Sequence, residues 1–289
     1  MTNYRGRFAP SATGPLHLGS ILAALISFLH AKHHRGQWLI RIDDLDGTRC
    51  KPIYTDKILR CLDAFALEPD VAIVYQRNRL AAYQAAFEDL KDLRLLYNCH
   101  CSRKSLPRGP YPGFCAYRLG QPLDEQWAIR MDTTDLDPGV DDLLLGEQCI
   151  ERPGDFIVKR RDGLFAYQLA CAVDEHLDQV THVIRGIDLL ESTPIQCLIA
   201  SKLNYRRPSY GHFPVIVGQD GAKLSKQAFT NSVDWSTPGR TYATLARLLL
   251  LNDTPGPEEA AIVWRDYFQS LGNPQSLVTG ASRSNTFSI

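Results

Sequence analysis

The chain has 289 residues, of which 44% are hydrophobic and 22% charged, a composition typical of a globular protein with two modest domains or one α/β domain and an insertion. Its 32 basic and 32 acidic side chains leave no net charge, which argues against a protein that coats nucleic acids through general basicity. Because no apolar run is long enough to span a membrane and no secretory signal precedes the first predicted strand, we expect a cytoplasmic protein whose eight cysteines are thiols or metal ligands.

Strand and helix patterns alternate in the N-terminal third of the chain. Apolar residues recur at helical spacing after a Pro/Gly-rich turn, and short apolar runs flank that helix. A strand–helix–strand unit of this kind begins a doubly wound parallel sheet, so the predicted fold class is α/β. We expect strands over 4–9, 37–42 and 95–99 and helices over 18–34, 55–65 and 79–93.

A Cys-rich and Pro/Gly-rich segment then interrupts the alternation, and regular structure resumes by Phe156. We therefore divide the chain into the first half of the α/β domain (1–97), an inserted subdomain (98–155), the second half of the domain (156–235) and a short helical C-terminal region with a flexible tail (236–289). The second half and the C-terminal region are expected to contain strands over 180–184 and 213–217, helices over 194–203, 242–251 and 258–271, and a poorly ordered tail over 278–289.

The turn over residues 10–16 and the helix that follows it predict an anion site. A helix that begins after such a turn offers unpaired N–H groups and a positive dipole end. His17 can donate to a phosphate oxygen, and Gly19 lets a ligand approach the backbone closely. Taken alone, the segment is equally well explained as a capped helix after a tight turn, but the chain has neither a Walker-type loop nor a dinucleotide glycine fingerprint.

A second basic segment, Lys-Leu-Ser-Lys-Gln, follows a glycine-rich loop about 200 residues later. It carries two ammonium groups and a hydroxyl, on Lys223, Lys226 and Ser225. Transfer of a phosphoryl or adenylyl group needs positive charge where negative charge develops. By itself the pentapeptide is better explained as an exposed basic hairpin, and its combination with the N-terminal anion site reverses that interpretation.

Three cysteines within seventeen residues, Cys99, Cys101 and Cys115, predict a structural tetrahedral zinc site in the turn-rich insertion. The fourth ligand is open among His100, Tyr111 and water, and three free thiols are the alternative to a metal site. The remaining cysteines are isolated, and we expect them to be small buried apolar residues: Cys50, Cys61, Cys149, Cys171 and Cys197.

The run from Arg7 to Gly19 resembles the opening of glutamyl-tRNA synthetases, Arg-Phe-Ala-Pro-Ser-Pro-Thr-Gly followed by His-Ile-Gly-His, with Ala12 in place of a proline and Ser20 in place of the second histidine. Together with the Lys-rich loop, it is similar to the two ATP-handling signatures of class I aminoacyl-tRNA synthetases. The resemblance implies a Rossmann-type catalytic domain that uses ATP with Mg²⁺ as its companion ion. The implied ATP site contains His17, Gly19, Ser20, Lys223, Ser225 and Lys226, of which His17 and Lys226 are catalytic.

Other stretches resemble the same enzymes and imply a glutamate pocket, because an amino dicarboxylate needs permanently charged donors and one acidic partner. Arg7 would bind the side-chain carboxylate and Asp43 the α-ammonium. Asp43 stands where the family has glutamate, so its carboxylate is shorter by one methylene, about 1.5 Å of reach that a water can bridge. The implied pocket also contains Phe8, Ala9, Pro10, Ser11, Tyr167 and Arg185.

The sequence ends about sixty residues after Lys226, without the large helical anticodon-binding region of glutamyl-tRNA synthetases. With its Cys-x-Cys…Tyr-x3-Cys pattern and Lys-Leu-Ser-Lys-Gln loop, it resembles the glutamyl-Q tRNA(Asp) synthetase family. That resemblance favours Tyr111 as the fourth zinc ligand. It implies activation of L-glutamate by ATP and its transfer to queuosine in the anticodon of tRNA(Asp), by a protein that we expect to be a monomer.

Three other functions compete with this interpretation. The first is a small tRNA(Glu)-charging synthetase, against which the missing anticodon reader argues. The second is a small-molecule ligase or nucleotidyltransferase without an RNA partner, which the pocket for an amino dicarboxylate disfavours. The third is a catalytically inactive, zinc-containing RNA-binding module, and the presence of His17 and Lys226 argues against it.

Overall fold

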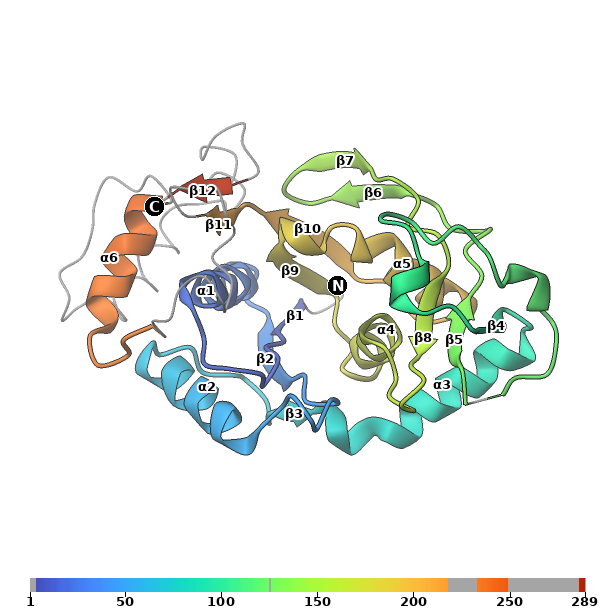
Figure 1. The fold of residues 1–289 in the computed structure, drawn as a ribbon. Helices are drawn as coiled ribbons and strands as arrows, with labels where there is room; N and C mark the ends of the chain where they lie inside the picture. The colour runs from blue at the N-terminus through green and yellow to red at the C-terminus, as the bar shows by residue number, and fades with distance from the viewer. Residues whose placement is uncertain (1–3, 125, 218–232, 249–285, 289) are drawn as a thin grey trace.

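The structure is a computed structural model that describes residues 4–124, 126–217, 233–248 and 286–288. Figure 1 shows parallel strands at its centre with helices on both sides, so the α/β fold class predicted from the sequence is confirmed. One parallel sheet has the order β1 (Arg5–Phe8), β2 (Gln37–Ile42), β3 (Val74–Tyr75).

A second sheet continues the first. Its parallel strands are β9, β10 and β6, and β7 pairs antiparallel with β6 at the edge. The two sheets meet where Thr181, just before β9, donates its backbone N–H to the carbonyl of Arg5 at 2.9 Å. The strand bounds are β6 (Gly139–Asp142), β7 (Gly146–Cys149), β9 (His182–Gly186) and β10 (Ser209–Phe213).

The two faces of the central sheet differ in chemistry. Alternate residues of β2, among them Trp38 and Ile40, join the apolar core under α1 (Leu18–His33). Arg41, the residue after Ile40, points to the opposite face, where it meets acidic residues of α4 (Tyr167–Leu177). Figure 1 shows α1 and α4 on opposite sides of β1. Because side chains alternate across a strand, one strand can supply both an apolar and an ionic layer.

The remaining helices pack around this framework. The four residues directly before α3 form a short 3₁₀ helix (Gln76–Arg79). The Tyr242 hydroxyl donates to the carbonyl of Phe65 at 2.6 Å, which ties α6 to the end of α2. Among the described residues, the longest apolar helices are too short or too polar to cross a membrane. The bounds are α2 (Pro52–Ala64), α3 (Leu80–Asp92), α5 (Ser192–Lys202) and α6 (Pro238–Leu248).

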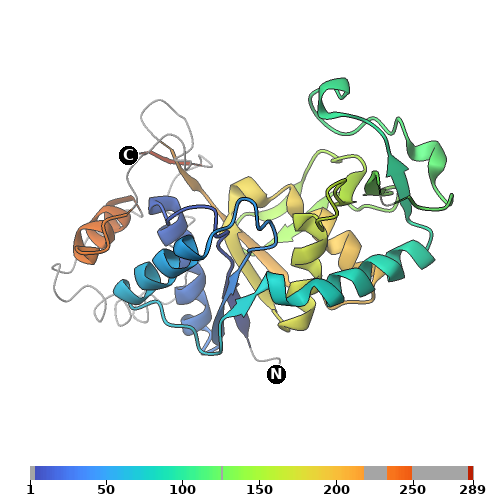
Figure 2. The ribbon, with the colours of Figure 1, turned by 60° about the horizontal axis from the view of Figure 1, so that its bottom comes forward.

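A small antiparallel sheet frames the segment that interrupts the α/β alternation: β5 (Ala128–Met131) lies within the segment, and β4 (Leu96–Cys99) and β8 (Phe156–Lys159) lie at its two borders. Figure 2 shows the green loops of this segment projecting beyond the end of α3. The β6–β7 hairpin falls inside the same predicted segment, yet it pairs with β10 of the main sheet. By strand pairing, this hairpin therefore belongs with the second half of the sheet.

Several predicted elements need correction. The strand expected over 213–217 is two strands, β10 and β11 (Val215–Val217). The tail expected to lack regular structure contributes β12 (Thr286–Ser288), which pairs parallel with β11. Helix α4 was not predicted at all. The helix expected over 258–271 lies outside the described residues.

Helix α4 is held to the sheet by a buried ionic network. Asp174, which is fully buried, accepts hydrogen bonds from Gln76 Nε2 at 2.7 Å, Arg79 Nη1 at 2.9 Å and the Tyr83 hydroxyl at 2.8 Å. Arg79 and Tyr83 donate to Oδ1, and Oδ2, which accepts from Gln76, also lies 3.4 Å from Arg41 Nε. Asp174 therefore joins β2, the 3₁₀ turn before α3 and α4 in one place.

Replacing Asp174 by alanine should leave the charges of Arg41 and Arg79 without this shared partner. Removing one partner of a buried ion pair costs about 3–5 kcal/mol, so we expect the free energy of unfolding, measured with urea, to fall by about that amount. Asp135→Ala is the matched control, because it makes the same change in an exposed pair with Lys202. Equal effects of the two substitutions would contradict the role given to Asp174.

Candidate active site

A pocket of about 310 Å³ opens at the carboxyl ends of β1 and β9. The sheet order runs through β2 and β3 on one side of this point and through β10 and β6 on the other. Ligands of doubly wound sheets bind at such a switch point, outside the carboxyl ends of the strands. The pocket therefore lies where this fold offers a binding site.

The first turn of α1 forms one wall of the pocket. His17 precedes the helix in an extended conformation, and its carbonyl accepts the N–H groups of Ser20 at 2.9 Å and Ile21 at 3.0 Å. This first turn contains no acidic side chain, so its positive dipole end is not neutralised locally. A Cβ on Gly19 would lie 3.3 Å from two ring atoms of His17, and glycine thus lets the imidazole rest against the helix.

The residues at the end of β1 and the start of the turn, which the sequence predicts to be part of the glutamate pocket, also line this cavity. The Phe8 ring stacks on Trp38 at 6.4 Å in the core, so it supports the wall from behind. Ser11 is exposed, and Pro10 is buried. The lining residues from this segment are Phe8, Ala9, Pro10 and Ser11.

Arg7 lines the pocket from the carboxyl-terminal half of strand β1 and is only 5% exposed. Its Nε donates to Glu175 Oε1 of α4 at 2.9 Å. Burial raises the pKa of Glu175, but the positive charges of Arg7 and Arg41 lower it more, so the pKa is lowered overall and the carboxylate stays ionised. Glu175 thus orients the guanidinium of Arg7, which lines the pocket.

Arg185 of β9 and Tyr167 at the start of α4 complete the opposite wall. Arg185 is 4% exposed and hydrogen-bonded to Gln196, Thr193 and His212. Tyr167 is 39% exposed and also lines the pocket. The structure therefore brings two buried arginines and one tyrosine of the predicted pocket together around one space.

Asp43 is placed differently from the others. Its backbone N–H donates to the carbonyl of Pro10 at 3.0 Å, and it forms a β-bridge with Ser11. Its carboxylate, however, is buried and accepts from Arg41 Nε at 2.7 Å, and it does not line the pocket. Asp43 lies next to the predicted position, with its carboxylate turned toward the ionic network.

Three predicted ATP-site residues, Lys223, Ser225 and Lys226, lie outside the described residues. Strand β11 precedes them in the sequence, and its first residue, Val215, lines the pocket. Sequence reasoning missed two groups that act on the predicted arginines, Glu175 and His212. The available signal for Glu175 was the pair of acidic residues, Asp174 and Glu175, directly after the apolar run 169–173, because acidic residues must be paired when buried.

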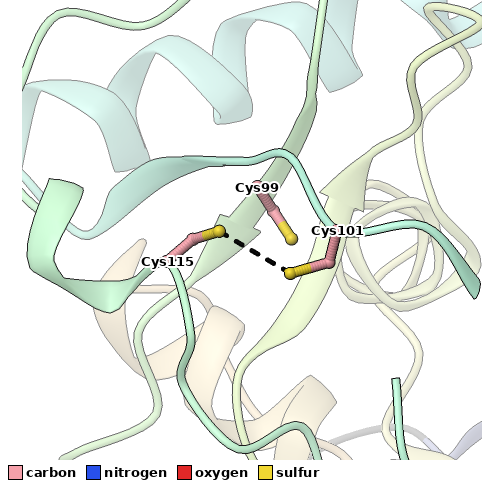
Figure 3. A group of neighbouring side chains, drawn as sticks. All are labelled: Cys99, Cys101 and Cys115. Atoms are coloured by element: carbon pink, nitrogen blue, oxygen red, sulfur yellow. Dashed lines mark hydrogen bonds between the residues drawn. The ribbon is translucent and has the colours of Figure 1, made fainter. Parts of the chain in front are cut away.

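The three predicted metal-binding cysteines meet in one cluster. Their sulfur atoms all lie within 4.8 Å of one another, and Figure 3 shows them converging from β4 and the two loops beyond it. The Cys101 and Cys115 sulfurs are 3.7 Å apart. Thiolates bound to one tetrahedral zinc ion at about 2.3 Å would lie about 3.8 Å apart, so the spacing suits a zinc ion.

The Tyr111 hydroxyl belongs to the same cluster. It lies 3.5 Å from Cys99 Sγ and 3.6 Å from Cys101 Sγ, close to the roughly 3.5 Å expected between an oxygen and a sulfur ligand of one zinc ion. His100 instead stacks on Trp127 with ring centroids 3.9 Å apart. The geometry therefore fits Tyr111 better than His100 as the fourth ligand.

The remaining cysteines divide between core and surface. Cys61 and Cys171 are buried, and Cys50 and Cys197 are partly buried. Cys149 is exposed at the end of β7, so the prediction of burial is wrong for this residue. A short polar strand at the sheet edge leaves its last side chain in solvent.

Comparison with known proteins agrees with this geometry. Residues 3–109 and 117–251 match the family model of class I tRNA synthetases (E and Q), catalytic domain. The sequence is 44% identical over 259 residues to the Glutamyl-Q tRNA(Asp) synthetase of Methylococcus capsulatus, a match that spans 88% of this chain and 85% of that protein. The protein of the same name from Acinetobacter baylyi is 45% identical over 239 residues, 81% of each chain.

The fold is also similar to solved structures. A glutamate tRNA ligase from Elizabethkingia meningosepticum, crystallised in complex with its amino acid, matches with a TM-score of 0.67 and 27% identity. The match covers 78% of this chain and 52% of the ligase, so the chain spans about half the length of that enzyme.

Asp43 gives a pH-dependent prediction. Burial raises the pKa of Asp43 to about 6, although Arg41 lowers it. The pKa of an unfolded aspartate is about 3.9. Between about pH 4 and pH 6 the native protein therefore binds more protons at Asp43 than the unfolded chain does, and it loses stability as the pH rises through this range. Asp43→Asn removes this titration, so the stability advantage of the variant over the parent should grow from about pH 4 to pH 6 and then stay constant.

The measurement is urea unfolding at a series of pH values. Asp46→Asn serves as a control of opposite sign, because hydrogen bonds from Thr48 and Arg160 lower the pKa of Asp46 to about 2. There the parent should gain stability relative to the variant as the pH rises from about 2 to 4. A pH-independent difference for Asp43→Asn would show that this carboxyl titrates normally.

Proposed function

Because this chain belongs to the class I tRNA synthetase family of the glutamyl and glutaminyl type, and within it to the glutamyl-Q tRNA(Asp) synthetases, we propose that it activates glutamate with ATP and transfers it to queuosine in the anticodon of tRNA(Asp). The observation that carries the proposal is the pair of buried arginines, Arg7 and Arg185, in one pocket beside the positive end of α1. Two permanent cations suit the side-chain carboxylate of glutamate, and a helix N-terminus suits a phosphate.

In the first step, an oxygen of the glutamate α-carboxylate attacks the α-phosphorus of ATP. A phosphorus–oxygen bond forms to give glutamyl-adenylate, and the bond to pyrophosphate breaks. His17 and the N–H groups at the start of α1 stabilise the charge that develops on the phosphate oxygens, with Lys226 acting from the loop outside the described residues. When bound with ATP, Mg²⁺ would supply further positive charge to the phosphates.

Arg7 and Arg185 hold the glutamate side-chain carboxylate in this proposal, and Tyr167 lines the same pocket. Asp43 would bind the α-ammonium through a water, or after its carboxylate turns away from Arg41. Fixing the substrate between these groups places its α-carboxylate near the phosphate site, and such positioning supplies much of the rate enhancement.

In the second step, a hydroxyl of queuosine attacks the activated carbonyl carbon and AMP leaves. The hydroxyl proton is lost in this attack, and we propose the adenylate phosphate as its acceptor. The cytoplasmic location and monomeric state derived from the sequence stay predictions.

We further propose that Cys99, Cys101, Cys115 and Tyr111 hold a structural zinc ion. The cluster joins the end of β4 to the loops that follow it, a part of the chain with few buried apolar residues. When bound, zinc would cross-link these loops, as structural zinc sites do in small turn-rich modules. Arg130, whose Nε donates to Cys99 Sγ at 3.2 Å, supports the thiolate form of that ligand.

The function is tested first by glutamate-dependent exchange of pyrophosphate into ATP, followed by mapping of labelled glutamate on tRNA fragments. We expect exchange with glutamate and label in the anticodon fragment of tRNA(Asp). Lys226→Ala should reduce exchange by roughly 10²–10³-fold, because it removes a cation at the developing charge.

Lys202→Ala, a charge removal in a surface ion pair with Asp135, is the matched control and should leave exchange unchanged. Label at the 3′ end of tRNA(Glu) would favour a charging synthetase instead. The absence of any exchange would refute the enzymatic proposal and favour an RNA-binding module.

The metal proposal is tested by metal analysis of purified protein. Cys101→Ser should lose most of one equivalent of zinc, because serine is a poor zinc ligand at neutral pH. Cys149→Ser makes the same change at an exposed thiol outside the cluster and should retain the metal. Equal zinc content in the two variants would contradict the proposed ligand set.

A further inference from the structure

Asp142, His212 and Arg185 form a buried, hydrogen-bonded line, one residue from each of three adjacent strands. These strands are β6, β10 and β9, which are labelled in Figure 1. The exposures of the three residues are 3%, 0% and 4%, respectively. His212 is the register partner of Arg185 in the parallel pairing of β10 with β9. The line ends at the pocket, because Arg185 is its only member that lines the cavity described above.

The hydrogen bonds of Arg185 occupy four of its five N–H groups. Nε donates to His212 Nε2 at 3.1 Å and Nη1 to Gln196 Oε1 at 2.9 Å. Nη2 donates to the Leu189 carbonyl at 3.1 Å and to Thr193 Oγ1 at 2.7 Å. A guanidinium has five donors and no acceptor, so one N–H of Nη1 is left for a ligand among the contacts of the described residues.

These contacts determine the tautomer of His212. Arg185 Nε is always a donor, so the ring nitrogen facing it, Nε2, must be an acceptor. The ring proton then lies on Nδ1, which is 2.5 Å from Asp142 Oδ2. The Thr193 hydroxyl, 3.2 Å from the same Nε2, can only donate to it.

Burial keeps His212 in its neutral form. It lowers the pKa of the imidazole, and the positive charge of Arg185 adds to that effect, while Asp142 opposes it. The pKa is lowered overall, so at neutral pH the ring is uncharged and one of its nitrogens can accept from Arg185.

The backbone fixes the other end of the line. Asp142 Oδ1 accepts three backbone N–H groups, from Leu144 at 3.0 Å, Leu145 at 3.0 Å and His212 at 3.1 Å. This leaves Oδ2 alone to face the imidazole. The carboxylate therefore cannot rotate without losing several buried hydrogen bonds.

We propose that Asp142 and His212 are positioning residues for the proposed glutamate pocket: Asp142 holds His212 in the Nδ1–H tautomer, and His212 holds Arg185 so that its single remaining N–H and its charge face the substrate carboxylate. This inference rests on the proposed function for the identity of the ligand. Neither residue touches the substrate, and both act through Arg185.

Asp142→Asn tests the proposal, because asparagine has nearly the same shape as aspartate but carries an NH₂ donor in place of one oxygen acceptor. The three backbone N–H groups at Oδ1 require the amide oxygen of asparagine to take that position, so its NH₂ group faces His212 Nδ1. The ring must then accept at Nδ1 and carry its proton on Nε2, where it meets the Arg185 N–H donor to donor. A buried donor left unsatisfied in this way should raise the KM for glutamate about tenfold or more, with the KM for ATP and kcat changing about twofold or less.

The tautomer itself is read by ¹⁵N NMR of histidine-labelled protein, with the His212 signal assigned by its loss in His212→Gln. We expect Nδ1–H in the parent and Nε2–H in Asp142→Asn, a change that general loss of packing would not produce. Asp141→Asn, the same substitution at the exposed neighbouring residue, is the matched control and should retain both the parental tautomer and the parental KM.

A second pair of variants tests the proposal should Asp142→Asn fold poorly. His212→Gln keeps a side-chain oxygen able to accept from Arg185 Nε, and His212→Leu has a similar size without an acceptor. The KM for glutamate should therefore rise about tenfold more in the leucine variant than in the glutamine variant.

The outcomes separate this proposal from the proposed function. Parental glutamate activation with an unchanged KM in Asp142→Asn and His212→Leu would overturn the positioning role and leave the function standing. An unaltered Nδ1–H tautomer in Asp142→Asn would also overturn it. A parent protein that shows the Nδ1–H tautomer but no glutamate-dependent exchange would refute the proposed function and the substrate assigned here, but not the hydrogen-bond arrangement.

Discussion

The ionic layer between the sheet and α4 is the interaction on which the rest of the site depends. Arg7 of β1 and Arg41 of β2 are buried side by side, and Asp174 and Glu175, adjacent on α4, face them. A buried arginine is tolerated only when it is paired and hydrogen-bonded. The helix must therefore cross the sheet directly beneath these two strands, which places its first residue, Tyr167, at the pocket.

Charge balance within this layer accounts for the unusual state of Asp43. Three cations, Arg7, Arg41 and Arg79, meet four carboxylates, of which Asp178 pairs with Arg79 at the edge. The carboxylates exceed the cations by one, and burial raises the pKa of Asp43, with the charge of Asp174 adding to the effect. A ligand that brings an ammonium group near Asp43 would compensate the excess, which supports the role proposed for this residue.

The sequence predicted the local parts of this site better than its long-range contacts. The strand–turn–helix from Arg5 to His33 followed from local periodicity, and its bounds in the structure differ from prediction by one residue at most ends. The cysteine cluster was predicted because its ligands lie close in the sequence. Helix α4 was missed, because its buried face carries Asp174 and Glu175, which read as polar residues until Arg7 and Arg41 are known to face them. No pattern within a short window connects residues that lie more than 130 positions apart.

The β6–β7 hairpin shows how such a long-range contact changes the meaning of a segment. Sequence reasoning assigned it to an insertion, separate from the α/β sheet, because it follows the cysteine-rich loops. In the structure it extends the sheet beside β10, and its last β6 residue, Asp142, reaches His212. Arg185 is thus oriented from both sides, by α5 through Thr193 and Gln196 and by the hairpin through His212. A pocket that must hold a charged group in one direction needs this kind of support, because an arginine side chain has too many rotamers to be fixed by its own strand.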